Sequence, residues 1–126
     1  MPGFTAEQRL KRRADFLRVQ NSTIRVSTKH FVLLFAANSD SNSPARLGVV
    51  ATKRIGNAVT RNRVKRIVRE TFRALAAIFP NGIDLVVIGR DRAAHIKAHE
   101  AVAEWREVER LIRKRAEAAL VPTIST

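Results

Sequence analysis

The sequence contains no cysteine, so neither a disulfide framework nor a cysteine-ligated zinc site can contribute to the fold. It also lacks any apolar run that approaches the roughly 18 residues of a membrane-spanning helix. The first residues, Met1-Pro2-Gly3-Phe4, lack the basic stretch followed by an apolar run that opens a secretory signal. We therefore expect a cytoplasmic protein that makes no contact with membranes.

Acidic residues are scarce: 11 Asp and Glu stand against 24 Lys and Arg, and the formal net charge is +13. Such an excess opposes compact folding through self-repulsion, and it is typical of proteins whose partner is a polyanion. The hydrophobic content of 45% is still sufficient for a core, which excludes a disordered basic tail. From the length of 126 residues we expect one domain over residues 1–126, with flexible ends at about 1–5 and 121–126.

The positive charge is concentrated in the first 75 residues. Residues 9–30 hold seven Lys or Arg and one acid, and residues 46–73 hold nine Lys or Arg and one acid. Residues 97–117, in contrast, hold six Lys or Arg and five Glu, so that segment is nearly neutral. The electrostatic contact surface is therefore predicted to lie in the N-terminal part of the chain.

The residue pattern predicts an α+β fold, a small α-β sandwich in the order α-β-β-β-α-β-α. β-branched and aromatic residues favour strands, and a Gly-Asn break followed by apolar residues at helical spacing favours a long central helix. Pro80-Asn81-Gly82 ends that helix. The expected helices are residues 13–20, 58–79 and 99–120, and the expected strands are residues 24–27, 31–35, 46–52 and 84–89.

The central helix separates its side chains into two faces. At 100° per residue, one arc of about 100° collects six apolar or small side chains for packing on the sheet: Val64, Ile67, Val68, Thr71, Leu75 and Ile78. The adjoining arc collects cations and an amide: Arg61, Asn62, Lys65, Arg66, Arg69 and Arg73, with Arg63 beyond it.

A solvated helix face is the ordinary explanation of a charge run, but such a face usually intersperses acids, as residues 97–117 do. Here only Glu70 intervenes, and like charges at i, i+4 spacing weaken an isolated helix. Arginine suits bidentate phosphate contacts, and Lys53 and Arg54 precede a helix N-terminus, where backbone N–H groups can hold an anion. DNA and RNA satisfy these electrostatics equally. Phe16, on a short helix beside basic residues, is either a base-stacking residue or a core residue.

One long motif resembles a known family. The stretch Lys53-Arg54-Ile55-Gly56-Asn57-Ala58-Val59-Thr60-Arg61-Asn62-Arg63-Val64-Lys65-Arg66 is similar to the Arg-Asn-Arg signature, with its lead-in, of the protein subunit of bacterial ribonuclease P. Agreement extends over nearly the whole chain. Arg13-Ala14-Asp15-Phe16 resembles the family's first helix, Phe31-Val32-Leu33 its early strand, and Asp84-Leu85-Val86-Val87-Ile88 its last strand.

The resemblance implies an RNA-binding domain with a left-handed β-α-β crossover, whose partners are the catalytic RNA of ribonuclease P and precursor tRNA. It implies endonucleolytic removal of the 5′ leader, with Mg²⁺ at the RNA–protein active site and no recognisable metal motif in the protein. The sequence leaves the oligomeric state of the protein alone open, and a monomer is favoured. Carried over by position, the residues that contact the catalytic RNA are Lys53, Arg54, Asn57, Arg61, Asn62, Arg63, Lys65, Arg66, Arg69 and Arg73. Those of the cleft for the single-stranded leader are Arg12, Arg13 and Phe16.

The chain departs from the family at two places. Gln20 and Leu34 stand where family members often carry aromatic residues, so leader contacts are expected to be less aromatic here. The main rival is a ribosomal or RNA-chaperone-type module with the same basic helix and no role in tRNA processing.

Catalysis by the protein alone is not expected. A protein nuclease needs clustered carboxylates for metal ions or a histidine pair for acid–base work, and the acids outside the last helix are scattered. His95 and His99 lie one helical turn apart, but the glutamate of a metalloprotease motif does not follow His95. Hydrolysis is therefore assigned to the RNA, with no catalytic residue in this chain.

Overall fold

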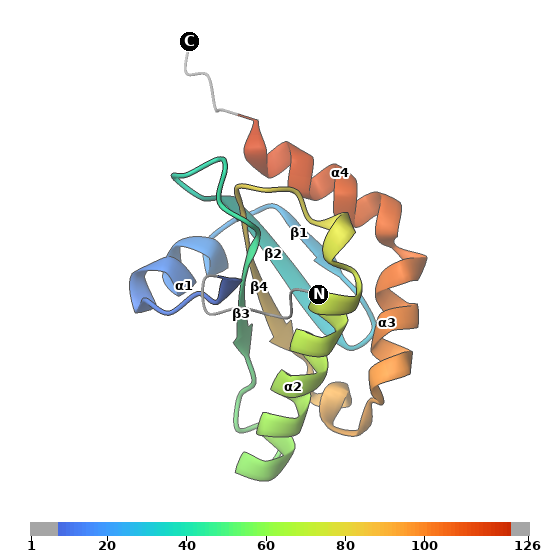
Figure 1. Cartoon of the computed structure of the whole chain (residues 1–126). Helices are drawn as coiled ribbons and strands as arrows, with labels where there is room; N and C mark the ends of the chain where they lie inside the picture. The colour runs from blue at the N-terminus through green and yellow to red at the C-terminus, as the bar shows by residue number, and fades with distance from the viewer. Residues whose placement is uncertain (1–7, 122–126) are drawn as a thin grey trace.

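The structure, a computed structural model, describes residues 8–121, so most of the ends expected to be flexible lie outside the described residues. Figure 1 shows one sheet with helices on both of its faces. The strands are β1 (Arg25–Ser27), β2 (Phe31–Ala37), β3 (Arg46–Val50) and β4 (Ile83–Gly89). The helices are α1 (Arg13–Gln20), α2 (Ala58–Ala74), α3 (Ala98–Glu107) and α4 (Glu109–Leu120), with short 3-10 helices η2 (Ala76–Ile78) and η3 (Asp91–His95).

The strand order in the sheet is β1-β2-β4-β3. β2 pairs antiparallel with β1 and with β4, whereas β3 and β4 are parallel neighbours joined through α2. Both parallel strands point downward in Figure 1, and seen from the α2 side β4 lies to the right of β3. This connection is therefore left-handed, as the resemblance implied, and opposite to the hand that β-α-β units nearly always take.

Alternating side chains give the sheet two packed faces. Phe31, Leu33 and Leu85 are fully buried on the face that α2, α3 and α4 cover, together with Trp105 of α3. The opposite face forms a smaller core around Leu10, Val19, Leu34 and Val86, where α1 packs. The molecule thus has three layers, and the predicted α+β sandwich and element order are confirmed.

The predicted inner face of the central helix is confirmed residue by residue, since Val64, Ile67, Val68 and Thr71 of α2 are buried, as are Leu75 and Ile78 just beyond its end. Asn57 caps the helix, because its side-chain oxygen accepts a hydrogen bond of 3.0 Å from the backbone N–H of Thr60. Gly56 precedes the cap with φ of +152°, a conformation that side-chain-bearing residues rarely adopt. The chain therefore turns from β3 into α2 at the predicted break.

Two of the predicted helices differ from the prediction, one in where it ends and one in its continuity. α2 ends at Ala74 and continues as η2, instead of running to residue 79. The single helix expected over residues 99–120 is interrupted at Val108, whose φ of −113° and ψ of 20° are not helical. The interruption lets α3 pack on α2 while α4 packs on β1 and β2, so that Trp105 and Ile112 are both fully buried.

Candidate nucleic-acid interface

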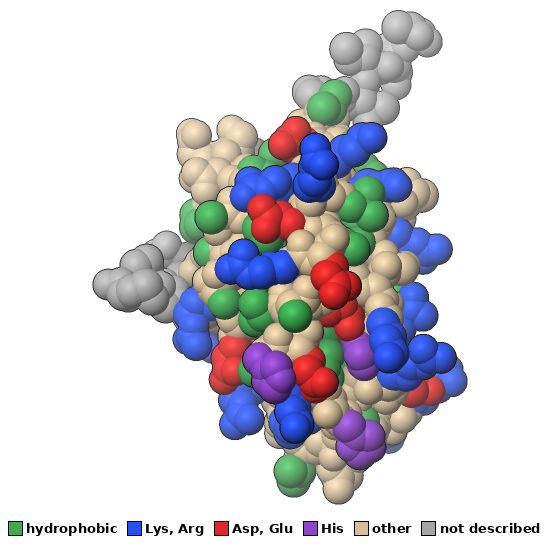
Figure 2. Space-filling view, turned by 90° about the vertical axis from the view of Figure 1, so that its right-hand side faces the viewer, with side chains coloured by type: hydrophobic (Ala, Val, Ile, Leu, Met, Phe, Trp, Pro, Cys, Tyr) green, Lys and Arg blue, Asp and Glu red, His purple; other side chains and the backbone are tan. Residues whose placement is uncertain are grey.

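The outer face of α2 presents cations with little opposing charge. Among its exposed or half-buried side chains, Glu70 is the one acid, and its Oε1 lies 3.7 Å from Nε of Arg66. Acids and bases alternate instead over the side of the molecule formed by α3 and α4, as Figure 2 shows. The predicted residues on and before α2 that reach solvent are Lys53, Arg54, Asn57, Arg61, Asn62, Arg63, Lys65, Arg66, Arg69 and Arg73.

Three of these predicted residues form side-chain hydrogen bonds to the backbone of the protein. Asn57 uses its side-chain oxygen as the helix cap, and Nη1 of Arg61 donates a hydrogen bond of 2.8 Å to the carbonyl of Gly56. Arg63 donates from Nη1 to the carbonyl of Ala94 at 3.1 Å and from Nη2 to the carbonyl of Ile96. The partners of Arg63 lie more than 30 residues further along the chain, so sequence spacing carried no signal for them.

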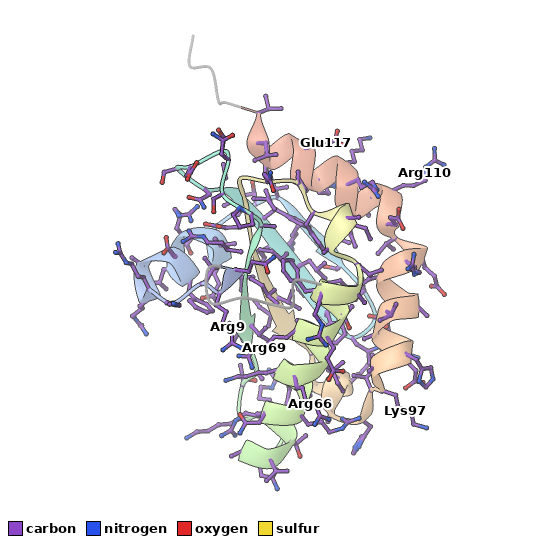
Figure 3. The ribbon with its side chains drawn as sticks, viewed as in Figure 1. Arg9, Arg66, Arg69, Lys97, Arg110 and Glu117 are labelled. Atoms are coloured by element: carbon purple, nitrogen blue, oxygen red, sulfur yellow. The ribbon has the colours of Figure 1, made fainter. Side chains whose placement is uncertain are left out.

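Arg9 extends the basic face beyond α2, and the sequence prediction did not assign it to this interface. The N–H of Leu10 donates to the carbonyl of Leu47 at 3.0 Å, which places the N-terminal segment beside β3. Burial lowers the pKa of Arg69, and the positive charge of Arg9 lowers it further. In Figure 3, Arg9 and Arg69 lie together beside β3, with Arg66 further along α2. An anion bound between such cations would relieve their mutual repulsion.

A groove of about 750 Å³ opens at the edge of the sheet where β3 and β4 end, and ten residues line it: Ser27, Thr28, Lys29, Thr52, Arg54, Ile88, Gly89, Arg90, Asp91 and Arg92. Ile88 belongs to the same sheet face as the α1 core, so the floor is apolar. Four cations surround it, and the carboxylate of Asp91 lies 3.3 Å from Nη2 of Arg54. An apolar floor within a cationic rim suits an unpaired nucleic-acid strand.

Phe16 lies between α1 and the sheet. Its ring contacts Gly48 so closely that a Cβ at that glycine would come within 2.6 Å of a ring carbon. The ring is only half-buried, and it packs in the same cluster as Val50 and Ile88, which continue toward the groove. Phe16 therefore packs on the core and keeps part of its ring accessible, and base stacking stays a prediction.

Phe16, Arg12 and Arg13 are not among the residues that line the groove. Arg13 is exposed on α1, and Arg12 lines a separate recess of about 410 Å³ at the N-terminal end of that helix. The recess also contains Arg9, Lys11, Asp15, Asn38, Ser39 and Arg46. The three residues predicted for the leader cleft thus lie apart: Arg12 in the recess, Arg13 on the exposed face of α1, and Phe16 between α1 and the sheet.

A buried carboxylate links α1 to the sheet, and the sequence prediction missed it. Asp84 is fully buried and accepts hydrogen bonds from Nε and Nη2 of Arg46 at 2.8 and 2.7 Å, and from Nη2 of Arg18. The hydrogen bond to Asp84 raises the pKa of Arg46, although burial acts in the opposite direction. The sequence did hold a signal for this ion pair, since Asp84 is a single acid at the start of an otherwise apolar central strand. A buried carboxylate needs a cationic partner.

Glu104 holds the turn between β1 and β2, which forms one rim of the groove. Its Oε2 accepts hydrogen bonds from Oγ1 of Thr28 at 2.5 Å and from the N–H of His30 at 3.0 Å, and its Oε1 lies 2.5 Å from Nδ1 of His30. Burial alone would raise the pKa of Glu104, but the hydrogen bonds from Thr28 and His30 outweigh burial and lower it. The rim is therefore held by a residue of α3, on the opposite side of the sheet.

Within residues 8–121, no three His, Asp or Glu side chains lie close enough together to hold a metal ion. The basic face of α2 does not fit a metal ion either, because its groups are cations and amides rather than carboxylates. No helix in the described part of the chain has both the length and the apolar character needed to cross a membrane.

Comparisons with known proteins agree on one family. The family model described as ribonuclease P matches residues 4–115. A ribonuclease P protein component from Gluconacetobacter diazotrophicus is 48% identical over 84 residues, which cover 66% of this chain and 72% of the relative. The one from Thermotoga maritima is 38% identical over 109 residues, which cover 86% of this chain and 90% of the relative.

Solved structures give the same result for the fold. The ribonuclease P protein of Staphylococcus aureus has a TM-score of 0.71 at 30% identity, over 82% of this chain and 94% of that chain. The ribonuclease P protein of Thermotoga maritima has a TM-score of 0.69 at 31% identity, over 84% of this chain and 96% of that chain.

Proposed function

The chain belongs to the ribonuclease P protein family, and from this premise we propose that it binds the catalytic RNA through α2 and the 5′ leader of precursor tRNA through the groove. It is the protein component of an endoribonuclease that cleaves tRNA precursors. Its relatives here are bacterial, and we place its action in the cytoplasm, where bacterial precursor tRNA is made.

The observation that carries the proposal is the positive charge on the outer face of α2, where Glu70 is the one acid. The inner face of the helix is committed to the core, so the helix cannot turn its cations away from solvent. Within residues 8–121, seven side chains on or before it form no hydrogen bond to the backbone, and all of them reach solvent: Lys53, Arg54, Asn62, Lys65, Arg66, Arg69 and Arg73. Such a surface binds phosphates, and displacement of their counterions makes the affinity depend on salt.

The groove supports the second part of the proposal. A leader is single-stranded, so its bases are free to contact an apolar floor while its phosphates meet cations. Ile88 supplies the floor, and Lys29, Arg90 and Arg92 supply positive charge around it. Phe16 extends the apolar surface toward α1, with part of its ring accessible for a base.

The chemistry of cleavage belongs to the RNA in this proposal. The basic interface lacks the carboxylates that would coordinate Mg²⁺, so the ions that assist hydrolysis would be held by RNA phosphates. What the protein's own residues contribute is charge neutralisation at α2 and orientation of the leader at the groove. Both effects reduce the repulsion between two polyanions, and both should matter most at low Mg²⁺.

Reconstitution with a bacterial catalytic RNA at low Mg²⁺ tests this function. Adding the protein should accelerate leader removal, and the reconstituted enzyme should bind precursor tRNA more tightly than mature tRNA. The protein without RNA should not cleave. Equal affinity for precursor and mature tRNA would instead favour a ribosomal or RNA-chaperone role, and cleavage by purified protein would contradict the assignment of catalysis to the RNA.

A pair of matched variants locates the interface. Arg66→Ala removes an exposed cation of α2, whereas Arg115→Ala removes an exposed cation of α4, where acids and bases are balanced. Arg66→Ala should weaken binding of the catalytic RNA and reduce the slope of log affinity against log salt by about one unit. Arg115→Ala should leave both unchanged, and equal effects of the two replacements would refute the location.

A further inference from the structure

Arg63 differs from the other cations of α2 in where its side chain ends. It is half-buried, and both terminal nitrogens of its guanidinium donate to backbone carbonyls, Nη1 to Ala94 at 3.1 Å and Nη2 to Ile96. Arg66, one turn away, has a side chain that is 68% exposed and, among residues 8–121, pairs with Glu70 of its own helix. A phosphate would have to displace two formed hydrogen bonds at Arg63 but none to the backbone at Arg66.

The carbonyls that Arg63 holds belong to the segment that closes one end of the groove. η3 follows β4 directly, and its first residues continue the groove lining begun by Arg90. Ala93 and Ile96 are buried with the main core, so η3 turns from the groove around the sheet edge toward α2. Arg63 donates its hydrogen bonds to the backbone carbonyls of Ala94 and Ile96 at the end of this turn.

Hydrogen bonds hold the turn formed by η3 at both of its ends. The N–H of Arg90 donates to the carbonyl of His30 at 2.9 Å, which fixes the start of the turn against β2. At the other end of the turn, Arg63 donates side-chain hydrogen bonds to the carbonyls of Ala94 and Ile96. A charged donor forms stronger hydrogen bonds than a neutral one, and a planar guanidinium can span two acceptors at once.

We propose that Arg63 is a positioning residue for the leader groove: it holds η3 in place so that Arg90 and Arg92 stand on the groove rim. Its place in the Arg-Asn-Arg motif predicts a contact with the phosphates of the catalytic RNA. In the positioning role Arg63 makes no such contact. The proposal rests on the proposed function of the groove in binding the leader.

Two replacements separate positioning from phosphate binding. Arg63→Lys keeps the positive charge but cannot span both carbonyls, and Arg63→Ala removes both properties. Arg66→Ala is the matched loss of an exposed cation from the same helix. Each variant is reconstituted with the catalytic RNA, and two quantities are measured: the salt dependence of RNA affinity, and the affinity of the holoenzyme for precursor tRNA with a long leader or with a single leader nucleotide.

If Arg63 positions the groove, its replacement should lower the affinity for precursor tRNA only when the leader is long. Both Arg63 variants should lower affinity for the long-leader precursor, by about tenfold for Arg63→Ala, the equivalent of one lost hydrogen-bonded contact. Affinity for the single-nucleotide leader and the salt slope of RNA binding should stay at the wild-type values. Arg66→Ala should show the reverse: a salt slope reduced by about one unit and equal effects on the two substrates.

Three results would overturn the proposal. A reduced salt slope for Arg63→Ala, with Arg63→Lys unaffected, would assign Arg63 to phosphate binding. Unchanged affinity for the long leader in Arg63→Lys would show that the two carbonyl contacts do not shape the groove, and this variant carries the test if Arg63→Ala does not fold. If the wild-type enzyme bound both leaders with equal affinity, the proposed function of the groove and this role of Arg63 would both be refuted. That measurement needs no variant and is made first.

Discussion

Replacing Asp84 by asparagine tests whether the buried carboxylate holds α1 on the sheet. Asp84 is fully buried at the start of β4, and it accepts three hydrogen bonds from two arginines. Asparagine keeps the shape of the side chain but removes its negative charge. Arg46 and Arg18 then lose their charged partner, and the amide N–H₂ of asparagine directs a donor toward groups that can only donate.

The expected cost is large because the carboxylate of Asp84 is fully buried, although the side chains of Arg18 and Arg46 are 40% and 23% exposed. Removing one partner of a buried ion pair typically destabilises a protein by about 3–5 kcal/mol, since it leaves an uncompensated buried charge. For a chain of this length about 4 °C of melting temperature corresponds to each kcal/mol, so the midpoint should fall by about 12–20 °C. A loss of this size is a substantial fraction of the roughly 5–15 kcal/mol that stabilises a domain.

Asp91→Asn is the matched control. Asp91 also pairs with an arginine, at 3.3 Å from Arg54, but the two side chains are 58% and 82% exposed. Water and ions screen such a pair, so its loss should cost at most about 1 kcal/mol. The same chemical change is thus made once in the interior and once at the surface.

Urea denaturation followed by circular dichroism gives the free energy of unfolding of both variants. Amide hydrogen exchange supplies a second measurement, because Arg18 of α1 binds Asp84 directly and α1 should lose protection before α2 does. A cost for Asp84→Asn below about 1 kcal/mol, no larger than that of Asp91→Asn, would refute the reasoning. So would unchanged protection in α1.

Three further changes have defined outcomes. Gly48→Ala places a Cβ 2.6 Å from the Phe16 ring, so it should displace that ring and weaken leader binding, measured with a fluorescent single-stranded oligonucleotide, while the salt slope of catalytic-RNA binding stays unchanged. Glu104 has a lowered pKa in the folded protein, so it stabilises the fold above about pH 4.3, the ordinary glutamate value, and this contribution is lost as the pH falls through the lower folded value. Urea titrations over that range should therefore show a steeper acid loss in wild type than in Glu104→Gln. Asn57→Ala should lower the free energy of unfolding by about 1 kcal/mol in thermal melts, because it removes the cap of α2, and an unchanged melting curve would contradict that role.

Local pattern was sufficient for α2 because a helix sorts its side chains by a period of 3.6 residues, whatever lies around it. The apolar arc predicted from the sequence is buried. The cations predicted beside it reach solvent, and Arg61, Arg63, Lys65 and Arg69 are half-buried. The strands were found in the same way, since β-branched runs and turn residues are also local signals. Composition and charge alone left the partner open between DNA and RNA. The motif around Arg61-Asn62-Arg63 indicated the family, and with it RNA as the partner.

Tertiary structure decided what depends on residues far apart in the chain. The carboxylate of Asp84 meets Arg18 across 66 positions and Arg46 across 38, and no spacing rule connects them. The break at Val108 likewise has no glycine or proline to mark it, because it follows from packing the two halves on different elements. For the same reason the sequence by itself determined that α2 carries the charge, whereas only the fold decided that Arg63 turns its guanidinium inward to the carbonyls beside the groove.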